Sequence, residues 1–69
     1  MSRVYFDDVT CVAESDRSIL VEIGDEQVWL PKSQVDEDSE VFKKDDEGRL
    51  VVTKWIAQER ELQGEDYDS

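Results

Sequence analysis

Short segments in which apolar and polar residues alternate constrain the fold of this chain more than any other feature. In the segment 17–23, Ile19, Val21 and Ile23 fall on one face, as in a strand with one buried face. Segments of this kind recur at intervals of roughly 8–12 residues, with turn residues between them. That spacing is typical of antiparallel sheets, in which short turns join the strands.

The first strand changes phase partway along its length. Val4 and Phe6 share one parity, whereas Val9 and Cys11 share the other. A change of parity moves apolar side chains to the other face of a sheet unless the strand bends. We therefore expect a bend or bulge at Asp7-Asp8.

Turn residues and proline divide the next part of the chain. The turn 24–26 would join 17–23 to a strand at 27–30 as a hairpin. Pro31 has no N–H and ends that strand, and residues 32–34 then form a single turn.

The residue pattern in the second half of the chain predicts strands at 40–42 and 49–53. The turn at 45–48 would join them, and Gly48 would supply the positive φ of this turn. From Thr53 the apolar period becomes that of a helix, with Thr53 as its N-cap and Gly64 as its end. One side of this helix would carry Trp55, Ile56, Glu59 and Leu62.

The predicted fold is α+β and mostly β. It is a small antiparallel meander of about five strands, forming a barrel-like or strongly curved sheet with one C-terminal helix over an open end. A single short helix cannot cover both faces of a flat sheet, and this favours the curved form. Residues 1–64 would form one small domain, and the acidic tail 65–69 would be frayed.

Charge is the strongest compositional feature. Nineteen Asp and Glu residues face eight Lys and Arg, and with no histidine the net charge is −11. Such a chain repels nucleic acid and anionic membranes, which bind clustered Lys and Arg, and it attracts a basic partner. The alternative is that the charge only keeps a small protein soluble, for which a magnitude of about 2–8 is usual.

Composition also argues against several classes of protein. Cys11 is the only cysteine, so an intramolecular disulfide is excluded, and a small core residue is expected there. No apolar run is long enough for a signal segment or a membrane span, so we expect a soluble, cytoplasmic protein. The lack of histidine removes the usual nucleophile-base pairs, and the isolated glycines form no phosphate loop. We predict neither an enzyme nor a cofactor.

Residues 34–48 concentrate acidic side chains. In an extended strand, Asp36, Asp38 and Glu40 would point the same way about 6.6 Å apart. Successive phosphates of a nucleic-acid strand have a similar separation, so this ladder would fit a groove that binds DNA backbone. Together with acidic turns, the predicted partner-binding residues are Asp25, Glu26, Asp36, Glu37, Asp38, Glu40, Asp45, Asp46 and Glu47.

Two features of this stretch have other interpretations. The pattern D-x-D-x-E matches the first ligands of a calcium loop, but its glycine and distal glutamate are missing, so no dedicated metal site is predicted. Lys43 and Lys44 interrupt the acidic array. They either relieve repulsion within the fold or contact an acidic rim on the partner.

Trp29 has the opposite parity to Val28 and Leu30, so one face of a strand cannot bury all three. We expect Trp29 in the core near Trp55. The alternative is a partly exposed Trp29 that acts as a hot spot of a protein interface.

The segment from Leu20 to Gly64 contains WLPKSQV and then GRLVVTKWIAQERELQG. It resembles small proteins of bacteriophages and other mobile elements that carry a W-[IL]-P-K-S-Q block followed by a tryptophan-containing C-terminal helix. In size, charge and lack of catalytic residues the chain is also similar to anti-CRISPR proteins that mimic DNA. That likeness is one of class rather than of motif.

These resemblances imply a monomeric, phage-encoded inhibitor in the cytoplasm of a bacterial host. It would occupy the basic site of a CRISPR–Cas effector complex that binds double-stranded DNA and its recognition motif (the PAM), without binding nucleic acid or membrane itself. The alternative is a non-enzymatic binding module that uses Trp29 and Pro31–Gln34 in host takeover or phage replication.

Overall fold

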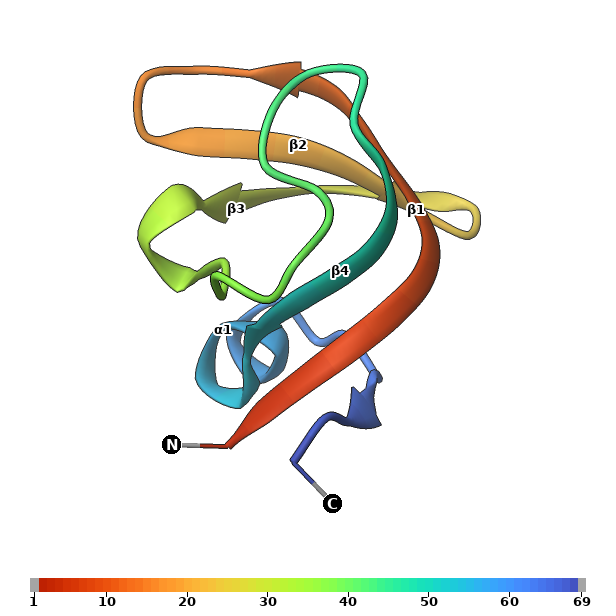
Figure 1. Cartoon of the computed structure of the whole chain (residues 1–69), viewed down its shortest axis with the longest axis vertical. Coiled ribbons are helices and arrows are strands. Elements are labelled where there is room, and N and C mark those ends of the chain that lie inside the picture. Colours follow the sequence, from red (N-terminus) through yellow and green to blue (C-terminus); the bar gives the residue numbers. More distant parts are fainter. Residues whose placement is uncertain (1, 69) are drawn as a thin grey trace.

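The sheet of the computed structural model, which describes residues 2–68, is antiparallel, and a short α-helix packs against it (Figure 1). The elements in chain order are β1 (Arg3–Glu14), β2 (Ser18–Ile23), β3 (Glu26–Pro31), the 3₁₀ turn η1 (Lys32–Gln34), β4 (Glu47–Thr53), α1 (Lys54–Glu59) and β5 (Glu65–Asp66). The predicted mostly-β fold with a single short helix is confirmed over the described residues.

The strand order is β3-β2-β1-β4, with β5 also paired to β1. The meander is therefore correct for β1 to β3, but β4 returns beside β1 and not beside β3. The long, bent β1 has room for three partners, because β5 pairs with Val4 and Tyr5 and β2 pairs beyond Thr10. The sheet is strongly curved but not closed, so the predicted barrel-like closure is not confirmed.

The predicted bulge in β1 is confirmed. The register with β4 shifts between Phe6 and Val9, and Asp8 adopts a left-handed conformation with φ of 58°. The bulge restores the phase of the strand. Val4 and Phe6, which precede the bulge, and Val9 and Cys11, which follow it, are therefore all buried.

The core lies on the inner face of the curved sheet. Val41 enters it from the loop between η1 and β4, and Ile56 and Ala57 enter it from α1. Cys11 is fully buried, as predicted, and its thiol donates to the carbonyl of Ala13 at 3.1 Å. Burial raises the pKa of this thiol above its usual value.

The predicted strand at 40–42 is wrong. The loop 35–46 instead follows the outer edge of β4, where Val35 bridges Val52 and the N–H of Glu40 donates to the carbonyl of Arg49 at 2.8 Å. The turn lies at 43–46 rather than 45–48, and Gly48 is already in β4 with φ of 137°.

The N-cap of α1 is confirmed, since Thr53 Oγ1 accepts a hydrogen bond from the N–H of Ile56 at 3.3 Å. The end of the helix was predicted wrongly. Arg60 is the C-cap and Glu61 has φ of 57°, so the chain leaves the helix before Gly64. Trp55 is also exposed, because the helix buries Ile56 and Ala57 instead.

The tail residues 65–68 contact the first strand. Glu65 and Asp66 form β5 against β1, and Asp68 binds Arg3 through its carboxylate. Ser69 lies outside the described residues. Within residues 2–68, α1 falls far short of the length and apolar content of a membrane-crossing helix.

Candidate functional site

The acidic ladder predicted at 36–40 does not form. Residues 36–39 make a tight turn, in which the N–H of Ser39 donates to the carbonyl of Asp36 at 3.0 Å. The carboxylates of Asp36 and Asp38 both bind the guanidinium of Arg3 at 3.1 Å. A turn brings these two side chains onto one cation, whereas an extended strand would have aligned them for a partner.

Other acidic residues of this stretch hold the loop together. Asp46 Oδ2 accepts hydrogen bonds from the N–H groups of Phe42 and Lys43 at 3.0 and 3.2 Å. Glu40 Oε1 accepts from the N–H of Arg49 at 2.8 Å. Irregular backbone needs acceptors for its N–H groups, and these carboxylates supply them.

Asp45 and Glu37 have no such role. Asp45 has φ of 76° in the turn before β4, and Glu37 lies in the turn 36–39. Neither side chain makes a hydrogen bond or an ion pair that involves the described residues. Each therefore adds charge to the surface of the loop.

Lys43 and Lys44 lie beside Glu14, the last residue of β1. Glu14 accepts from Lys32 Nζ at 3.1 Å and from the N–H of Lys44 at 3.3 Å. These contacts, the Lys32 hydrogen bond first, lower the pKa of the Glu14 carboxyl. The ammonium groups of Lys43 and Lys44 form no ion pair with other residues of 2–68.

A second group of acidic side chains crosses the outer face of the sheet. Thr10 of β1 is opposite Glu47 of β4 and also opposite Glu22 of β2. Residues directly opposite one another share a face, and neighbouring strands lie about 4.8 Å apart, which puts Glu47 and Glu22 about 10 Å apart. The β2–β3 turn, which carries Asp25 and Glu26, comes directly after β2 in the chain.

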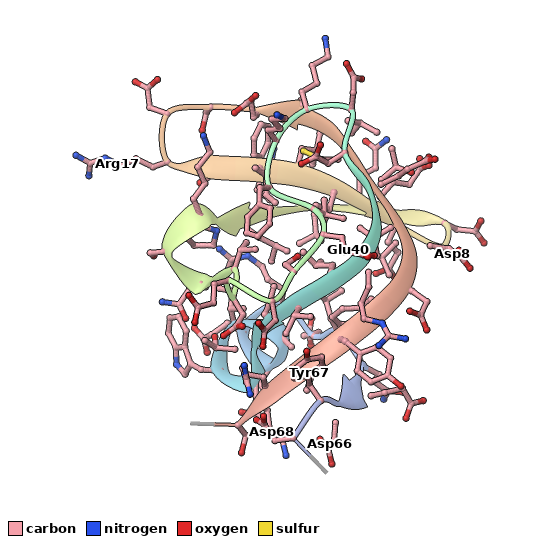
Figure 2. All side chains as sticks on the ribbon, viewed as in Figure 1. Asp8, Arg17, Glu40, Asp66, Tyr67 and Asp68 are labelled. Atoms are coloured by element: carbon pink, nitrogen blue, oxygen red, sulfur yellow. The ribbon has the colours of Figure 1, made fainter. Side chains whose placement is uncertain are left out.

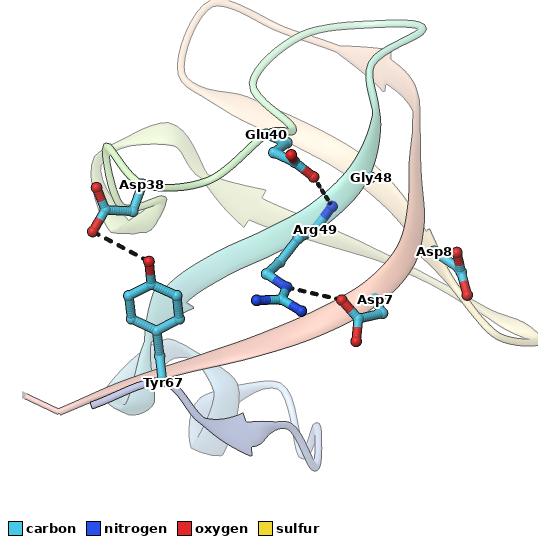
Figure 3. Close-up of a pocket in the computed structure, with 7 residues that line it drawn as sticks. All are labelled: Asp7, Asp8, Asp38, Glu40, Gly48, Arg49 and Tyr67. Carbon is cyan, nitrogen blue, oxygen red and sulfur yellow. Dashed lines mark hydrogen bonds and ion pairs between the residues drawn. The ribbon is translucent and has the colours of Figure 1, made fainter. Parts of the chain in front are cut away.

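The bulge in β1 extends this group along the molecule. Asp7, Asp8 and Glu40 are among the residues that line a hollow of about 630 Å³. In Figure 3, Asp7 and Glu40 lie on either side of Arg49, and Asp8 lies on the outer side of β1. A smaller hollow beside it is lined by Asp8, Thr10, Glu47 and Gly48. We call the carboxylates of this region the acidic surface and define it by Asp7, Asp8, Glu22, Asp25, Glu26, Glu40 and Glu47; Glu26 lies opposite Ile23 at the end of the hairpin.

The cation beside the acidic surface is Arg49. Its Nε donates to Asp7 Oδ1 at 2.9 Å, and its guanidinium lies 4.4 Å from the ring centre of Tyr5. The hydrogen bond to Asp7 raises the pKa of the Arg49 guanidinium above its usual value, so the cation stays charged. Seven carboxylates against one guanidinium give a local charge of −6, more than half of the net −11.

Asp8 of the acidic surface lies far from the β1–β2 turn. Asp8 and Arg17 point into solvent on opposite sides of the molecule (Figure 2). Asp8 is therefore remote from the cation of the β1–β2 turn.

Sequence reasoning identified part of this surface. Asp25, Glu26, Glu40 and Glu47 belong to it, whereas Asp36 and Asp38 bind Arg3. Reasoning from local density missed three residues that only the sheet brings together: Asp7, Asp8 and Glu22. The parity change at residues 7–8 marked the bulge, but its carboxylates were not connected with the loop.

The acidic surface offers a partner negative charge and hydrogen-bond acceptors. Among the described residues, no three His, Cys, Asp or Glu side chains come together as a metal site. Every buried side-chain nitrogen or oxygen within residues 2–68 has a hydrogen-bond partner. All seven carboxylates of the acidic surface belong to exposed residues.

Trp29 is 47% exposed, so the prediction that it lies in the core is wrong. It is opposite Leu20 on the outer face of the β2–β3 hairpin, and the Nε of Arg60 donates to its carbonyl at 3.0 Å. The inner face already holds Leu30 and Val28, which leaves the outer face for the indole.

Comparison of the chain with protein-family models, with curated proteins and with solved structures gives no match.

Proposed function

We propose that this chain is a non-enzymatic inhibitor that binds the basic DNA-binding surface of another protein by imitating the charge of double-stranded DNA. The partner class we propose is a CRISPR–Cas effector complex in the cytoplasm of a bacterial host, with the acidic surface covering the site for DNA and its recognition motif. The inhibitor would be phage-encoded and act as a monomer. The observation that carries this proposal is the local charge of −6 that the acidic surface and Arg49 give a small sheet.

Magnitudes support mimicry of a short duplex. The longest dimension of the molecule is 29 Å. A duplex of that length carries about 17 charges, at one charge per ~1.7 Å of helix axis. A net charge of −11 reaches about two thirds of that density. Association should therefore be fast and should weaken steeply with salt.

The test is competition for target DNA. Purified effector complexes of several CRISPR types are mixed with labelled duplex that carries the target and its recognition motif, and DNA binding is followed by anisotropy. We expect the wild-type chain to displace the duplex from at least one complex. An effector that is inhibited while it still binds DNA normally would contradict the proposal.

Two matched double variants locate the surface. Glu22→Lys/Glu47→Lys reverses two charges on the acidic surface, and Asp16→Lys/Glu59→Lys reverses two exposed charges elsewhere. Each reversal adds two units, so both variants change the net charge from −11 to −7. We expect only the first variant to lose competition. Equal losses would assign the effect to net charge alone.

A second candidate function is supported by the exposure of Trp29. A binding module that uses Trp29 and Pro31–Gln34 in host takeover or phage replication would not depend on the acidic surface. In that case Glu22→Lys/Glu47→Lys should retain binding to the host partner, and Trp29→Ala should abolish it.

A further inference from the structure

The outer face of the β2–β3 hairpin carries an apolar strip that the core does not use. Leu20 and Trp29 are opposite each other on this face, and neither belongs to the buried cluster. Trp29 is 47% exposed and Leu20 is half-buried. We call this pair the Leu20–Trp29 strip.

The Leu20–Trp29 strip borders the acidic surface. The next pair along the hairpin on the same face is Glu22 and Gln27. Glu22 and Trp29 are diagonal neighbours across the two strands, about 7–8 Å apart, so the Glu22 carboxylate lies within reach of a group that contacts the indole. Gln27 Nε2 donates to Glu22 Oε2 at 3.3 Å and leaves the other oxygen of Glu22 without a partner among the described residues.

We propose that the Leu20–Trp29 strip binds an arginine side chain of a basic protein segment, with the guanidinium stacked on Trp29 and its N–H groups donating to Glu22. This inference rests on the proposed function, because it names the residue type that the partner presents to one edge of the acidic surface.

The chemistry of the strip favours arginine over lysine. A guanidinium is planar and weakly hydrated, and it can stack on an indole while its edge binds a carboxylate. An ammonium group is strongly hydrated and acts as a point charge, so it gains less from the indole. Leu20 beside the ring adds apolar area for the arginine stem.

Tryptophan fluorescence provides a direct test with defined probes. Trp55→Phe leaves Trp29 as the single tryptophan, and Trp29→Phe leaves Trp55, which is 57% exposed and serves as the matched reporter. Each protein is titrated with hexa-arginine and with hexa-lysine at about 0.15 M salt, where the Debye length is ~8 Å. We expect a saturable change of Trp29 emission with hexa-arginine, a smaller one with hexa-lysine, and no saturable change of Trp55.

Calorimetry with hexa-arginine then measures the contribution of the ring. Trp29→Ala should weaken binding by about 2- to 30-fold, the range of cation–π contacts, while the salt dependence of binding stays unchanged. Trp55→Ala should bind like the wild type. Thermal unfolding confirms that each variant is folded.

The outcomes separate this inference from the proposed function. If Trp29→Ala binds hexa-arginine like the wild type, or if hexa-arginine and hexa-lysine bind alike, the arginine site is refuted. If in addition Glu22→Lys/Glu47→Lys still competes with duplex DNA, the proposed function is refuted as well. Loss of competition in that double variant with no effect of Trp29→Ala refutes only the arginine site.

Discussion

The guanidinium of Arg3 binds the carboxylate of Asp68, and this contact joins the first strand to the end of the tail across 65 positions of sequence. The same side chain binds Asp36 and Asp38 and lies 4.9 Å from the ring centre of Tyr67. A single cation therefore brings the tail and the loop 35–46 together on β1. Without it, three carboxylates would face one another.

Arg3→Met should destabilise the fold more than Lys32→Met. The first change leaves three carboxylates without their cation, whereas the second removes a single ion pair with Glu14. Like charges held together repel, so we expect the larger drop in melting temperature for Arg3→Met, measured by circular dichroism. Equal drops for the two variants would show that Arg3 does not organise the acidic segments.

The contact between Arg3 and Asp68 should make stability depend on pH. The hydrogen bond from Arg3 lowers the pKa of the Asp68 carboxyl in the folded state. A lowered pKa contributes stability that is complete above the unfolded pKa of about 3.9 and is lost as the pH falls through the folded value. Wild type should therefore exceed Asp68→Asn in free energy of unfolding above about pH 5, and the difference should shrink towards zero at lower pH.

A control uses Arg3→Met as the background. Without Arg3, the change Asp68→Asn should lose this pH dependence, because the hydrogen bond that lowers the pKa is gone. Denaturant titrations of the four proteins at several pH values provide the measurement. A difference that persists in the Arg3→Met background would assign the effect to another group.

Gly48→Ala should be more destabilising than Gly24→Ala. Both glycines have positive φ, but a Cβ at residue 48 would lie 2.6 Å from Glu40 Oε1, whereas a Cβ at residue 24 would meet no atom within 4 Å. We expect about 1–2 kcal/mol from the left-handed conformation at Gly24 and a larger loss at Gly48. Glu40→Ala in the Gly48→Ala background should recover part of the loss in chemical unfolding.

Thr53→Ala should cost about 1 kcal/mol, the usual value for an N-cap. Its hydroxyl accepts from the N–H of Ile56 and also donates to Gln34 Oε1 at 2.7 Å, so the change affects both α1 and η1. Thr53→Ser keeps both contacts and is the control. A loss as large in Thr53→Ser would place the effect in the γ-methyl group instead.

Moderate salt should raise the melting temperature of the wild type. The carboxylates of the acidic surface outnumber their one guanidinium, and added ions screen their mutual repulsion. Glu22→Lys/Glu47→Lys should respond less steeply, because part of the repulsion has been removed. A melting temperature that does not change with salt would show that the charges are already compensated.

The sequence was most informative where one short segment determines its own structure. The bulge at Asp7-Asp8, the β2–β3 hairpin, the end of β3 at Pro31 and the N-cap at Thr53 each follow from local parity or residue chemistry. In these cases the alternative conformation would turn apolar side chains to the other face of the sheet, or would leave a backbone hydrogen bond without its partner. Local rules were therefore sufficient.

Prediction failed where a distant partner decides the outcome. Asp36 and Asp38 alternate like a strand, but they lie in a turn in which both bind Arg3 from β1. The place of β4 beside β1 depends on packing across the whole chain. The acidic surface combines β1, β2 and β4, and no stretch of the sequence by itself indicates that Asp8, Glu22 and Glu47 lie together.

Cys11 has a consequence for how opening of the fold can be timed. Its thiol is fully buried between neighbouring strands, and its raised pKa keeps it in the unreactive protonated form. Because it is the single cysteine, a thiol reagent modifies the chain at one position. The rate of modification under native conditions therefore reports the opening of β1 from its neighbours, with no mutation required.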